Sequence, residues 1–356
     1  MTIQQIVDPS EIEPELIRIW EALGKEKTRS SLFNLIVYTK FSPRTDYFRN
    51  IAQKVVEKFP CRTLFISHDP DSPQPYLKTA ISVASPSAEE ASIACDQIDI
   101  GVAGPDLERV PSIILPHLIP DLPIYLLWAE DPSVPHLLFP ILAKLSTRII
   151  FDSESADNLL DFAKTILDLH QKTGIDVGDL NWARTGGWRD LVASTFDTSQ
   201  RQDLLKKITL LKIVYNARET EFFCHLKIQA MYLLAWASNR LGWKFEKAAP
   251  TYFQFQSVDA RIQSEKWEKL GPGTVISVAL HTSDGHIFEA GRIPDAYHCV
   301  KIQFSSDEQC DLPFRYVLGQ TATGQSLVNE ICTKGTSKHY LEMLKELEIL
   351  DKDRLC

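Results

Sequence analysis

The side chains with the greatest capacity for binding are concentrated in one short segment, DLNWARTGGWRDLV (Asp179–Val192). Trp182 and Trp188 stand on either side of a Gly-Gly pair, and Arg184 and Arg189 accompany them. Tryptophan and arginine are strongly enriched in protein-binding hot spots, because each combines a large contact area with a directed polar group. The segment therefore predicts a surface that binds another protein.

The same segment also has a structural interpretation. Its two indole rings could fill the joint between two domains, since such joints need large aromatic side chains as well. In that case the arginines would pair with the nearby carboxylates of Asp179 and Asp190. Both interpretations stay open at the level of the sequence.

A second candidate is a phosphate-binding loop, GQTATGQS (Gly319–Ser326), which follows the strand-like run FRYVL and precedes a helix. A nucleotide-binding P-loop needs a lysine to reach the terminal phosphates, and Gln325 occupies that position. What remains is a weak anion site or an ordinary helix start. No G-x-G-x-x-G fingerprint follows a strand of the first half, so we expect no bound cofactor.

The best cluster for a metal ion consists of His281, Asp284, His286 and Glu289. In a two-residue hairpin closed at Asp284-Gly285, the two histidines share one face and the glutamate points to the other. Two ligands are too few for zinc, so polar residues around a surface turn are the better interpretation. The chain also has no G-x-S-x-G nucleophile elbow. We therefore expect no metal site and no catalytic set, and predict that the protein is not an enzyme.

The cysteines follow neither a C-x-x-C pattern nor a metal-finger spacing. They are Cys61, Cys95, Cys224, Cys299, Cys310, Cys332 and Cys356. An odd, dispersed set in a cytosolic chain predicts mostly buried thiols. Cys356, the last residue, is the exception, because an exposed thiol there could react with oxidants, although an exposed thiol without a role is the simpler interpretation.

Composition narrows the classes of partner. The chain has 356 residues, 44% of them hydrophobic and 24% charged, which is typical of a globular protein of two domains. Its net charge of −9, with no lysine or arginine cluster, argues against nucleic-acid binding. The most apolar window, Pro111–Ala129, is interrupted by four prolines and two polar residues, so it predicts no membrane helix. With no signal peptide at the N-terminus, we expect a cytoplasmic protein.

Short apolar runs alternate with helical patterns in the first half of the chain. We expect strands at Phe33–Thr39, Cys61–Ser67, Ser92–Ile100, Leu122–Trp128 and Thr147–Ser153, and helices at Pro43–Phe59, Pro105–Leu118, Pro135–Leu145 and Ser155–Gly174. This alternation is typical of a parallel sheet covered by helices on both faces. Residues 1–175 are therefore predicted to form a Rossmann-like open α/β domain without a dinucleotide fingerprint.

The pattern changes after Gly174. A helix at Thr220–Leu241 is apolar over much of its circumference, which predicts burial. Short alternating runs then indicate an antiparallel sheet, in the order YFQFQ, TVISVAL, HIFEAG, CVKIQF and FRYVLG. Two helices, near Gly324–Thr333 and Ser337–Leu350, close the chain. Residues 176–356 are predicted to form an α+β domain.

Four segments in order resemble the glucose-6-phosphate dehydrogenase assembly proteins, the OpcA family. They are FPCRTLFI (Phe59–Ile66), LIPDLPIYLLWAEDP (Leu118–Pro132), LAKLSTRIIFDS (Leu142–Ser153) and DLNWARTGGWRDLVASTFD (Asp179–Asp197). Two positions depart from the family pattern: Ala129 replaces the second tryptophan of an LWW run, and Thr147 replaces the first arginine of an RRI run.

The resemblance implies an allosteric activator that performs no chemistry itself. Such proteins bind glucose-6-phosphate dehydrogenase and promote its active oligomer, which supports NADPH production in the pentose phosphate pathway. On the matching positions it implies a protein-protein interaction surface, or residues that brace the domains. Those positions are Asp121, Trp128, Arg148, Trp182, Arg184, Trp188 and Arg189. The resemblance also raises redox control, but no cysteine here matches such a role.

Two alternatives remain. Pro120 and Pro123 fix the backbone around Asp121 just before a strand, which fits either a binding edge or a plain turn. A different class of function is an enzyme or sensor that binds a sugar phosphate or nucleotide in a cleft between the domains. Arg148, Arg184 and Arg189 would then hold the phosphate.

Overall fold

The structure is a computed structural model, and it describes residues 4–24, 27–84, 93–220, 225–306, 308, 310–318 and 324–350. The chain divides into two compact units that interleave along the sequence. Unit 1 comprises Met1–Asp152, Leu169–Leu180 and Ala322–Gly335; unit 2 comprises Ser153–Asp168, Asn181–Thr321 and Thr336–Cys356. The division of the chain into two domains at residues 175 and 176 stays a prediction.

Unit 1 contains a nine-stranded, largely parallel sheet, called sheet 1, with the order β1-β5-β6-β4-β3-β7-β8-β9 and β2 paired with β6. The parallel strands that carry the site are β3 (Asn34–Lys40), β4 (Arg62–His68), β6 (Ile93–Ala103), β7 (Ile124–Trp128), β8 (Arg148–Phe151) and β9 (Asp176–Asp179). Their continuous apolar runs are buried, as expected for strands covered on both faces. The predicted α/β fold is confirmed.

One edge of sheet 1 differs from the prediction of a parallel sheet. Strands β5 (Tyr76–Ala84) and β1 (Gln5–Val7) run antiparallel to their neighbours, and β2 (Thr28–Arg29) is a short addition on β6. β5 and β6 follow each other in sequence, so their antiparallel pairing needs no crossover helix.

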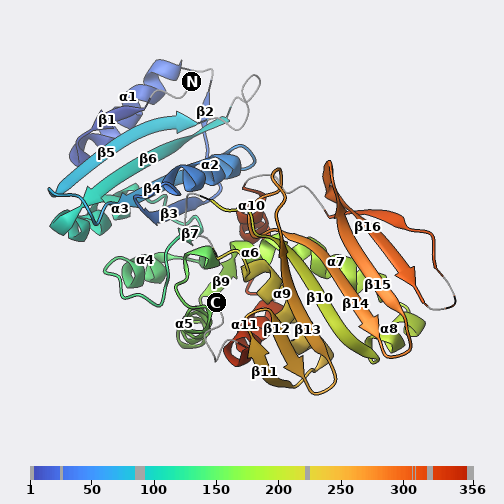
Figure 1. Ribbon diagram of the computed structural model, residues 1–356. Helices are drawn as coiled ribbons and strands as arrows, with labels where there is room; N and C mark the ends of the chain where they lie inside the picture. Colours follow the sequence, from blue (N-terminus) through green and yellow to red (C-terminus); the bar gives the residue numbers. More distant parts are fainter. Residues whose placement is uncertain are drawn as a thin grey trace. The chain divides into compact units, whose positions relative to one another are not determined.

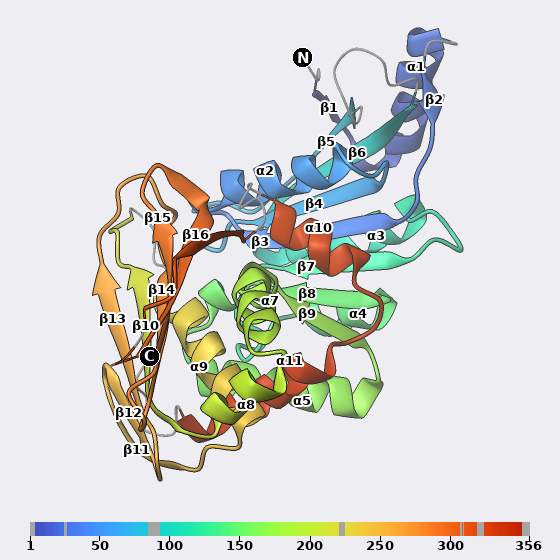
Figure 2. The ribbon, with the colours of Figure 1, turned by 90° about the vertical axis from the view of Figure 1, so that its right-hand side faces the viewer.

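Helices cover sheet 1, and one of them comes from far along the sequence. The helices assigned wholly to unit 1 are α1 (Ile12–Leu23), α2 (Thr45–Val56), α3 (Val110–His117), α4 (Phe139–Leu145) and α10 (Gln325–Cys332). α10 packs beside α2, so a helix that we assigned to the second domain by sequence belongs to unit 1 (Figure 2). Gly324 begins α10 at φ +84°, where a Cβ would lie 2.5 Å from Lys54 Cβ; glycine permits this close packing.

Unit 2 is built on an eight-stranded, mostly antiparallel sheet, called sheet 2, with the order β11-β12-β13-β10-β14-β15-β16-β17. Its strands are β10 (Ile208–Asn216), β11 (Phe245–Ala249), β12 (Tyr252–Phe255), β13 (Asp259–Glu265), β14 (Val275–Thr282), β15 (Ile287–Ile293), β16 (Ala296–Ser305) and β17 (Phe314–Val317). β10 and β13 are parallel, and the other pairs are antiparallel. The predicted α+β class is confirmed.

One face of sheet 2 is covered by helices (Figures 1 and 2). They are α6 (Leu180–Arg184), α7 (Gly186–Thr195), α8 (Ser199–Leu205), α9 (Ile228–Leu241) and α11 (Lys338–Leu350). α9 is buried on nearly all sides, as predicted; it begins at Ile228, and residues 221–224 of the predicted helix lie outside the described residues. Helix α5 (Leu159–Thr173) is divided between the units in sequence.

Candidate functional site

The segment rich in tryptophan and arginine forms the two short helices α6 and α7. Its indole side chains are buried in the structure: Trp182 is 6% exposed and Trp188 is 1% exposed. Trp182 contacts the ring of Tyr340 on α11, with ring centroids 5.6 Å apart. Within unit 2 the two tryptophans therefore contribute contact area to the protein's own core.

The arginines of this segment hold its two helices together. Arg189 Nη1 donates to the carbonyl of Trp182 at 2.8 Å and to Thr185 Oγ1 at 2.5 Å, while its guanidinium lies 3.3 Å from the centroid of the Trp182 ring. Arg184 Nη1 forms an ion pair with Glu154 at 2.6 Å and donates to Asn181 Oδ1 at 2.8 Å. These contacts join α6 to α7 and to the chain that precedes them.

The second glycine of the Gly-Gly pair, Gly187, has a steric reason. A Cβ on Gly187 would lie 2.5 Å from the carbonyl oxygen of Leu318, closer than carbon and oxygen approach. Helix α7 thus starts with its backbone in contact with the chain that follows β17. The Gly-Gly pair forms the start of α7.

The remaining predicted residues lie in unit 1 and have different environments. Asp121 is exposed in a turn at φ +65°, just before β7, which is the plain-turn geometry. Trp128 is buried at the end of β7, with its ring stacked 4.2 Å from that of Tyr38, and its Nε1 has no hydrogen-bond partner among the described residues.

Arg148, at the start of β8, takes part in a buried ion pair. It is 3% exposed, and its Nη2 lies 2.5 Å from Glu330 Oε2 on α10. Its Nη1 donates to the carbonyl of Gly335 at 2.6 Å. Gly178 on β9 leaves room for the pair, since a Cβ there would lie 2.0 Å from Glu330 Oε2. The pair fastens α10 to sheet 1.

The carboxyl ends of β3 and β7 form the topological switch point of sheet 1. The chain leaves β3 towards β4 on one side and later returns to β7 on the other. In open α/β sheets, dinucleotides bind at this point, with their phosphates on free backbone N–H groups of the first loop. The loop after β3 is therefore where a cofactor phosphate would be held in this fold.

In this protein the N–H groups of that loop are already bonded. Glu130 Oε1 accepts from Lys40 N at 2.7 Å, and the carbonyl of His68 accepts from Phe41 N at 2.6 Å. The N–H groups of Ser42, Arg44 and Thr45 donate to acceptors within the loop, at 2.9, 3.2 and 2.9 Å, and residue 43 is a proline. A phosphate would have to break these bonds and displace a carboxylate.

A hydrogen-bonded network that sequence analysis missed lies beneath the switch point. The hydroxyl of Tyr38 is 2.6 Å from His136 Nε2 and 3.0 Å from His68 Nδ1. Leu138 N donates to His136 Nδ1 at 3.1 Å, so neutral His136 carries its proton on Nε2 and donates to Tyr38. Tyr38 in turn donates to His68 Nδ1. The network links the ends of β3 and β4 to the loop after β7.

Burial lowers the pKa of His136 to about 4, and the charge of Lys40, together with that of His68 once it is protonated, acts in the same direction. The folded-state pKa is thus below the ordinary value of about 6.5, and the unfolded chain takes up the proton first as the pH falls. We therefore expect the free energy of unfolding to fall by about 1 kcal/mol as the pH is lowered from 6.5 to 5. This value is reduced from the full effect of the His136 pKa shift because the side chain is partly exposed. Chemical denaturation across this range should show a smaller loss for His136→Gln than for the wild type; equal pH dependence would contradict this assignment.

Several predicted features lie outside the described residues. These are Cys356, Cys224 and residues 319–323 of the proposed anion loop. Among the described residues, no group of three or more His, Cys, Asp or Glu side chains is placed to hold a metal ion. His281 pairs with Ile287, so it does not share a face with His286 as predicted. No helix in the described part of the chain is long and apolar enough to span a membrane.

A largely parallel sheet in one unit and a largely antiparallel sheet in the other define the fold as Rossmann-like α/β combined with α+β. A variant of KijD10, a 3-ketoreductase from Actinomadura kijaniata in complex with TDP-benzene and NADP, is similar over 90% of this chain and 97% of that chain. The TM-score is 0.52 and the identity is 8%, so the likeness concerns the fold alone.

Sequence comparison defines the family. Residues 52–167 match the family model of the glucose-6-phosphate dehydrogenase subunit N-terminal domain, and residues 175–354 match that of its C-terminal domain. The chain belongs to this family, the glucose-6-phosphate dehydrogenase assembly proteins known as OpcA, as the sequence motifs indicated.

Two curated relatives, from Synechococcus elongatus and Nostoc punctiforme, are named OpcA with a provisional assignment to the OxPP cycle. They are 29% and 27% identical to this chain, over 54% and 59% of its length. The matched regions span 42% and 43% of those proteins, so less than half of each relative is represented.

Proposed function

We propose that this protein is a non-catalytic regulator that binds glucose-6-phosphate dehydrogenase and promotes its active oligomer. The observation that carries the proposal is the match of both family models, which together extend over most of the chain. NADPH production in the oxidative pentose phosphate pathway would then rise through the partner enzyme. An activator of this kind must bind the active oligomer more tightly than the inactive form, and about 1.4 kcal/mol of difference shifts the equilibrium tenfold.

The geometry of the switch point supports a role without a cofactor. The loop that would hold a dinucleotide phosphate has its N–H groups bonded to Glu130, His68 and acceptors of its own. Glu130 also adds a negative charge there, paired with Lys40 Nζ at 3.4 Å. In this Rossmann-like fold, the N–H groups that would bind a dinucleotide phosphate are therefore bonded to the protein's own acceptors.

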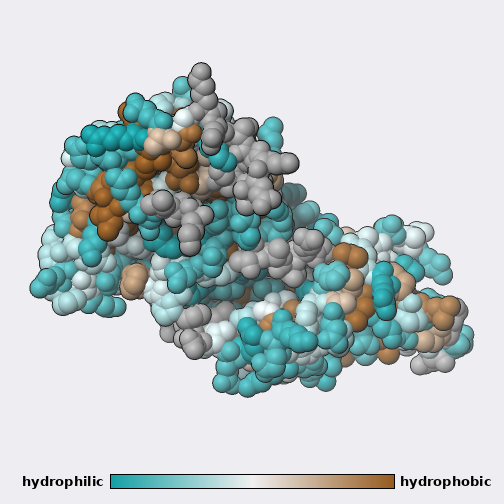
Figure 3. Space-filling view, turned by 90° about the horizontal axis from the view of Figure 1, so that it is seen from above, coloured by the Kyte–Doolittle hydropathy of each residue, from teal (hydrophilic) through white to brown (hydrophobic). Residues whose placement is uncertain are grey.

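We further propose that the partner binds at the outer edge of sheet 2. The face of the molecule in Figure 3 is largely hydrophilic and carries separate apolar patches. Exposed apolar patches on a hydrophilic surface often mark protein-protein interfaces. β17 is the last strand of sheet 2, and Leu312, Phe314 and Val317 on or beside it are 90%, 45% and 61% exposed. Exposed edge strands usually avoid such residues, because they invite pairing.

The function is tested with purified glucose-6-phosphate dehydrogenase from the same organism. We expect this protein to co-elute with the dehydrogenase on a sizing column and to raise its rate of NADPH formation across a range of glucose 6-phosphate concentrations. Unchanged kinetics together with separate elution would refute the regulator. Co-elution without a kinetic effect would indicate a purely structural subunit instead.

A matched pair of variants tests the proposed surface. Val317→Lys places a charge on β17, whereas Val134→Lys makes the same change at a valine of unit 1 that is 47% exposed. We expect Val317→Lys to weaken binding at least tenfold and Val134→Lys to leave it unchanged, since one buried charge at an interface costs more than 1.4 kcal/mol. Equal binding by both variants would exclude the β17 edge.

A phosphate-binding sensor is less well supported by the geometry. Arg148, Arg184 and Arg189 were its candidate phosphate ligands, but Arg148 is engaged by Glu330 and Arg184 by Glu154. Arg189 is occupied by Thr185 and by the Trp182 carbonyl. Titration of the isolated protein with glucose 6-phosphate measures this alternative directly, and we expect no heat of binding.

A further inference from the structure

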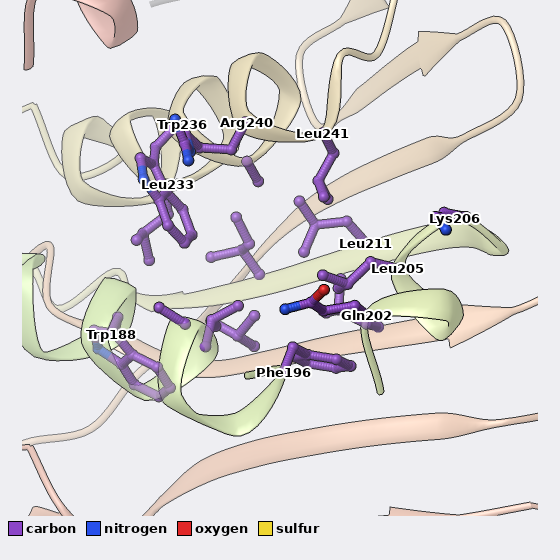
Figure 4. A pocket seen from close by; sticks show the side chains of 16 residues that line it. Trp188, Phe196, Gln202, Leu205, Lys206, Leu211, Leu233, Trp236, Arg240 and Leu241 are labelled. Atoms are coloured by element: carbon purple, nitrogen blue, oxygen red, sulfur yellow. The ribbon is translucent and has the colours of Figure 1, made fainter. Parts of the chain in front are cut away.

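Unit 2 contains a cavity of about 480 Å³ between helices α7, α8 and α9 and strands β10 and β14 of sheet 2 (Figure 4). A volume between about 300 and 1,000 Å³ is typical of sites for small molecules. Sixteen residues line it. All but three of these side chains are apolar.

The three polar lining residues mark the opening of the cavity. Gln202, Lys206 and Arg240 are all exposed, whereas the deep lining residues such as Leu211 and Val278 are buried. None of the lining residues is acidic. Lys206 also contacts Asp203 at 2.7 Å, but both side chains are largely exposed, so this ion pair holds the ammonium only weakly. An apolar interior is thus combined with a positively charged opening.

We propose that this cavity binds an amphipathic carboxylate, with its hydrocarbon chain among the apolar side chains and its head group at Lys206 or Arg240, which lie at different places around the lining (Figure 4). Charge complementarity favours an anionic head group over a neutral or cationic one. The protein carries a net charge of −9, whereas the charged residues that line this cavity are both cationic. Trp188 and Trp236 provide flat apolar walls for the chain. The site is independent of the proposed partnership with the dehydrogenase.

Calorimetric titration of the full chain with simple amphiphiles, below their micelle-forming concentrations, tests the proposal. We expect dodecanoate to bind with one-to-one stoichiometry and decanoate to bind about 15-fold more weakly, because two methylenes are removed from the apolar contact. Dodecanol should bind about tenfold more weakly than dodecanoate, and dodecyltrimethylammonium more weakly still. No dodecanoate binding, or equal affinity for the cationic amphiphile, would overturn the proposal.

Variants assign the binding to this cavity. Ala237→Phe fills it from α9 and should abolish dodecanoate binding, while Arg240→Gln combined with Lys206→Gln should lower dodecanoate affinity about tenfold without changing that for dodecanol. Lys338→Gln, which removes an exposed cation from α11, is the matched control. Binding that survives in Ala237→Phe would place the ligand elsewhere. The comparison of amphiphiles uses the wild type, so it stands even where a variant fails to fold.

Discussion

Replacing Arg148 by alanine is expected to lower the free energy of unfolding by about 3–5 kcal/mol. Arg148 and Glu330 are both almost completely buried, and their side chains lie 2.5 Å apart. Alanine would leave the carboxylate of Glu330 in the interior without its counter-charge, and would also remove the bond to the carbonyl of Gly335. Since the pair fastens α10 to sheet 1, the loss should appear in the unfolding transition of unit 1, followed by chemical denaturation.

A double variant separates the loss of the pair from the burial of a lone charge. Arg148→Met combined with Glu330→Leu replaces both charges by apolar groups of similar size, and such exchanges are often neutral. We therefore expect the double variant to regain most of the stability that Arg148→Ala loses. If Arg148→Ala lowered the free energy of unfolding by less than about 1 kcal/mol, the ion pair would not hold α10 on sheet 1. Arg148 could then serve as a phosphate ligand, as the sensor alternative requires.

The sequence predicted Arg148 as a functional residue but could not predict its partner. Glu330 is 182 positions away, on a helix that the sequence assigns to the other half of the chain. No periodicity relates two residues at such a separation, because periodicity reports only local structure. The network of Tyr38, His68 and His136 escaped prediction for the same reason, since 98 residues separate Tyr38 from His136.

Local patterns predicted the elements more successfully. The continuous apolar runs that became β3, β4 and β7 are long enough to indicate buried strands from sequence alone. β5 was missed, because YLKTAISVA mixes polar and apolar residues and forms part of an antiparallel edge. The segment Asp179–Val192 was predicted to bind a partner or to brace the domains, because tryptophan is enriched both in hot spots and in cores. Only the tertiary structure distinguishes these two environments.

The burial of Trp188 leads to a second large expected effect. We expect Trp188→Ala to lower the free energy of unfolding by about 3–5 kcal/mol, because the side chain is 1% exposed and its removal enlarges the adjoining cavity. Arg292, whose guanidinium lies 5.6 Å from the indole centroid, would lose its aromatic neighbour as well. Trp236→Ala is the matched control: it borders the same cavity but is only partly buried, so its loss should be clearly smaller.

Trp188→Phe distinguishes a bracing residue from a residue that binds the partner. Trp188 Nε1 has no hydrogen-bond partner among the described residues, so phenylalanine keeps most of the apolar contact without breaking a hydrogen bond. We expect this variant to be only about 1–2 kcal/mol less stable than the wild type and, under the proposed function, to activate the dehydrogenase normally. Thermal unfolding and the activation assay on the same preparation decide the matter. If Trp188→Phe kept normal stability but lost activation, the indole of Trp188 would have to contact the partner. The segment DLNWARTGGWRDLV would then be a binding hot spot rather than a structural brace.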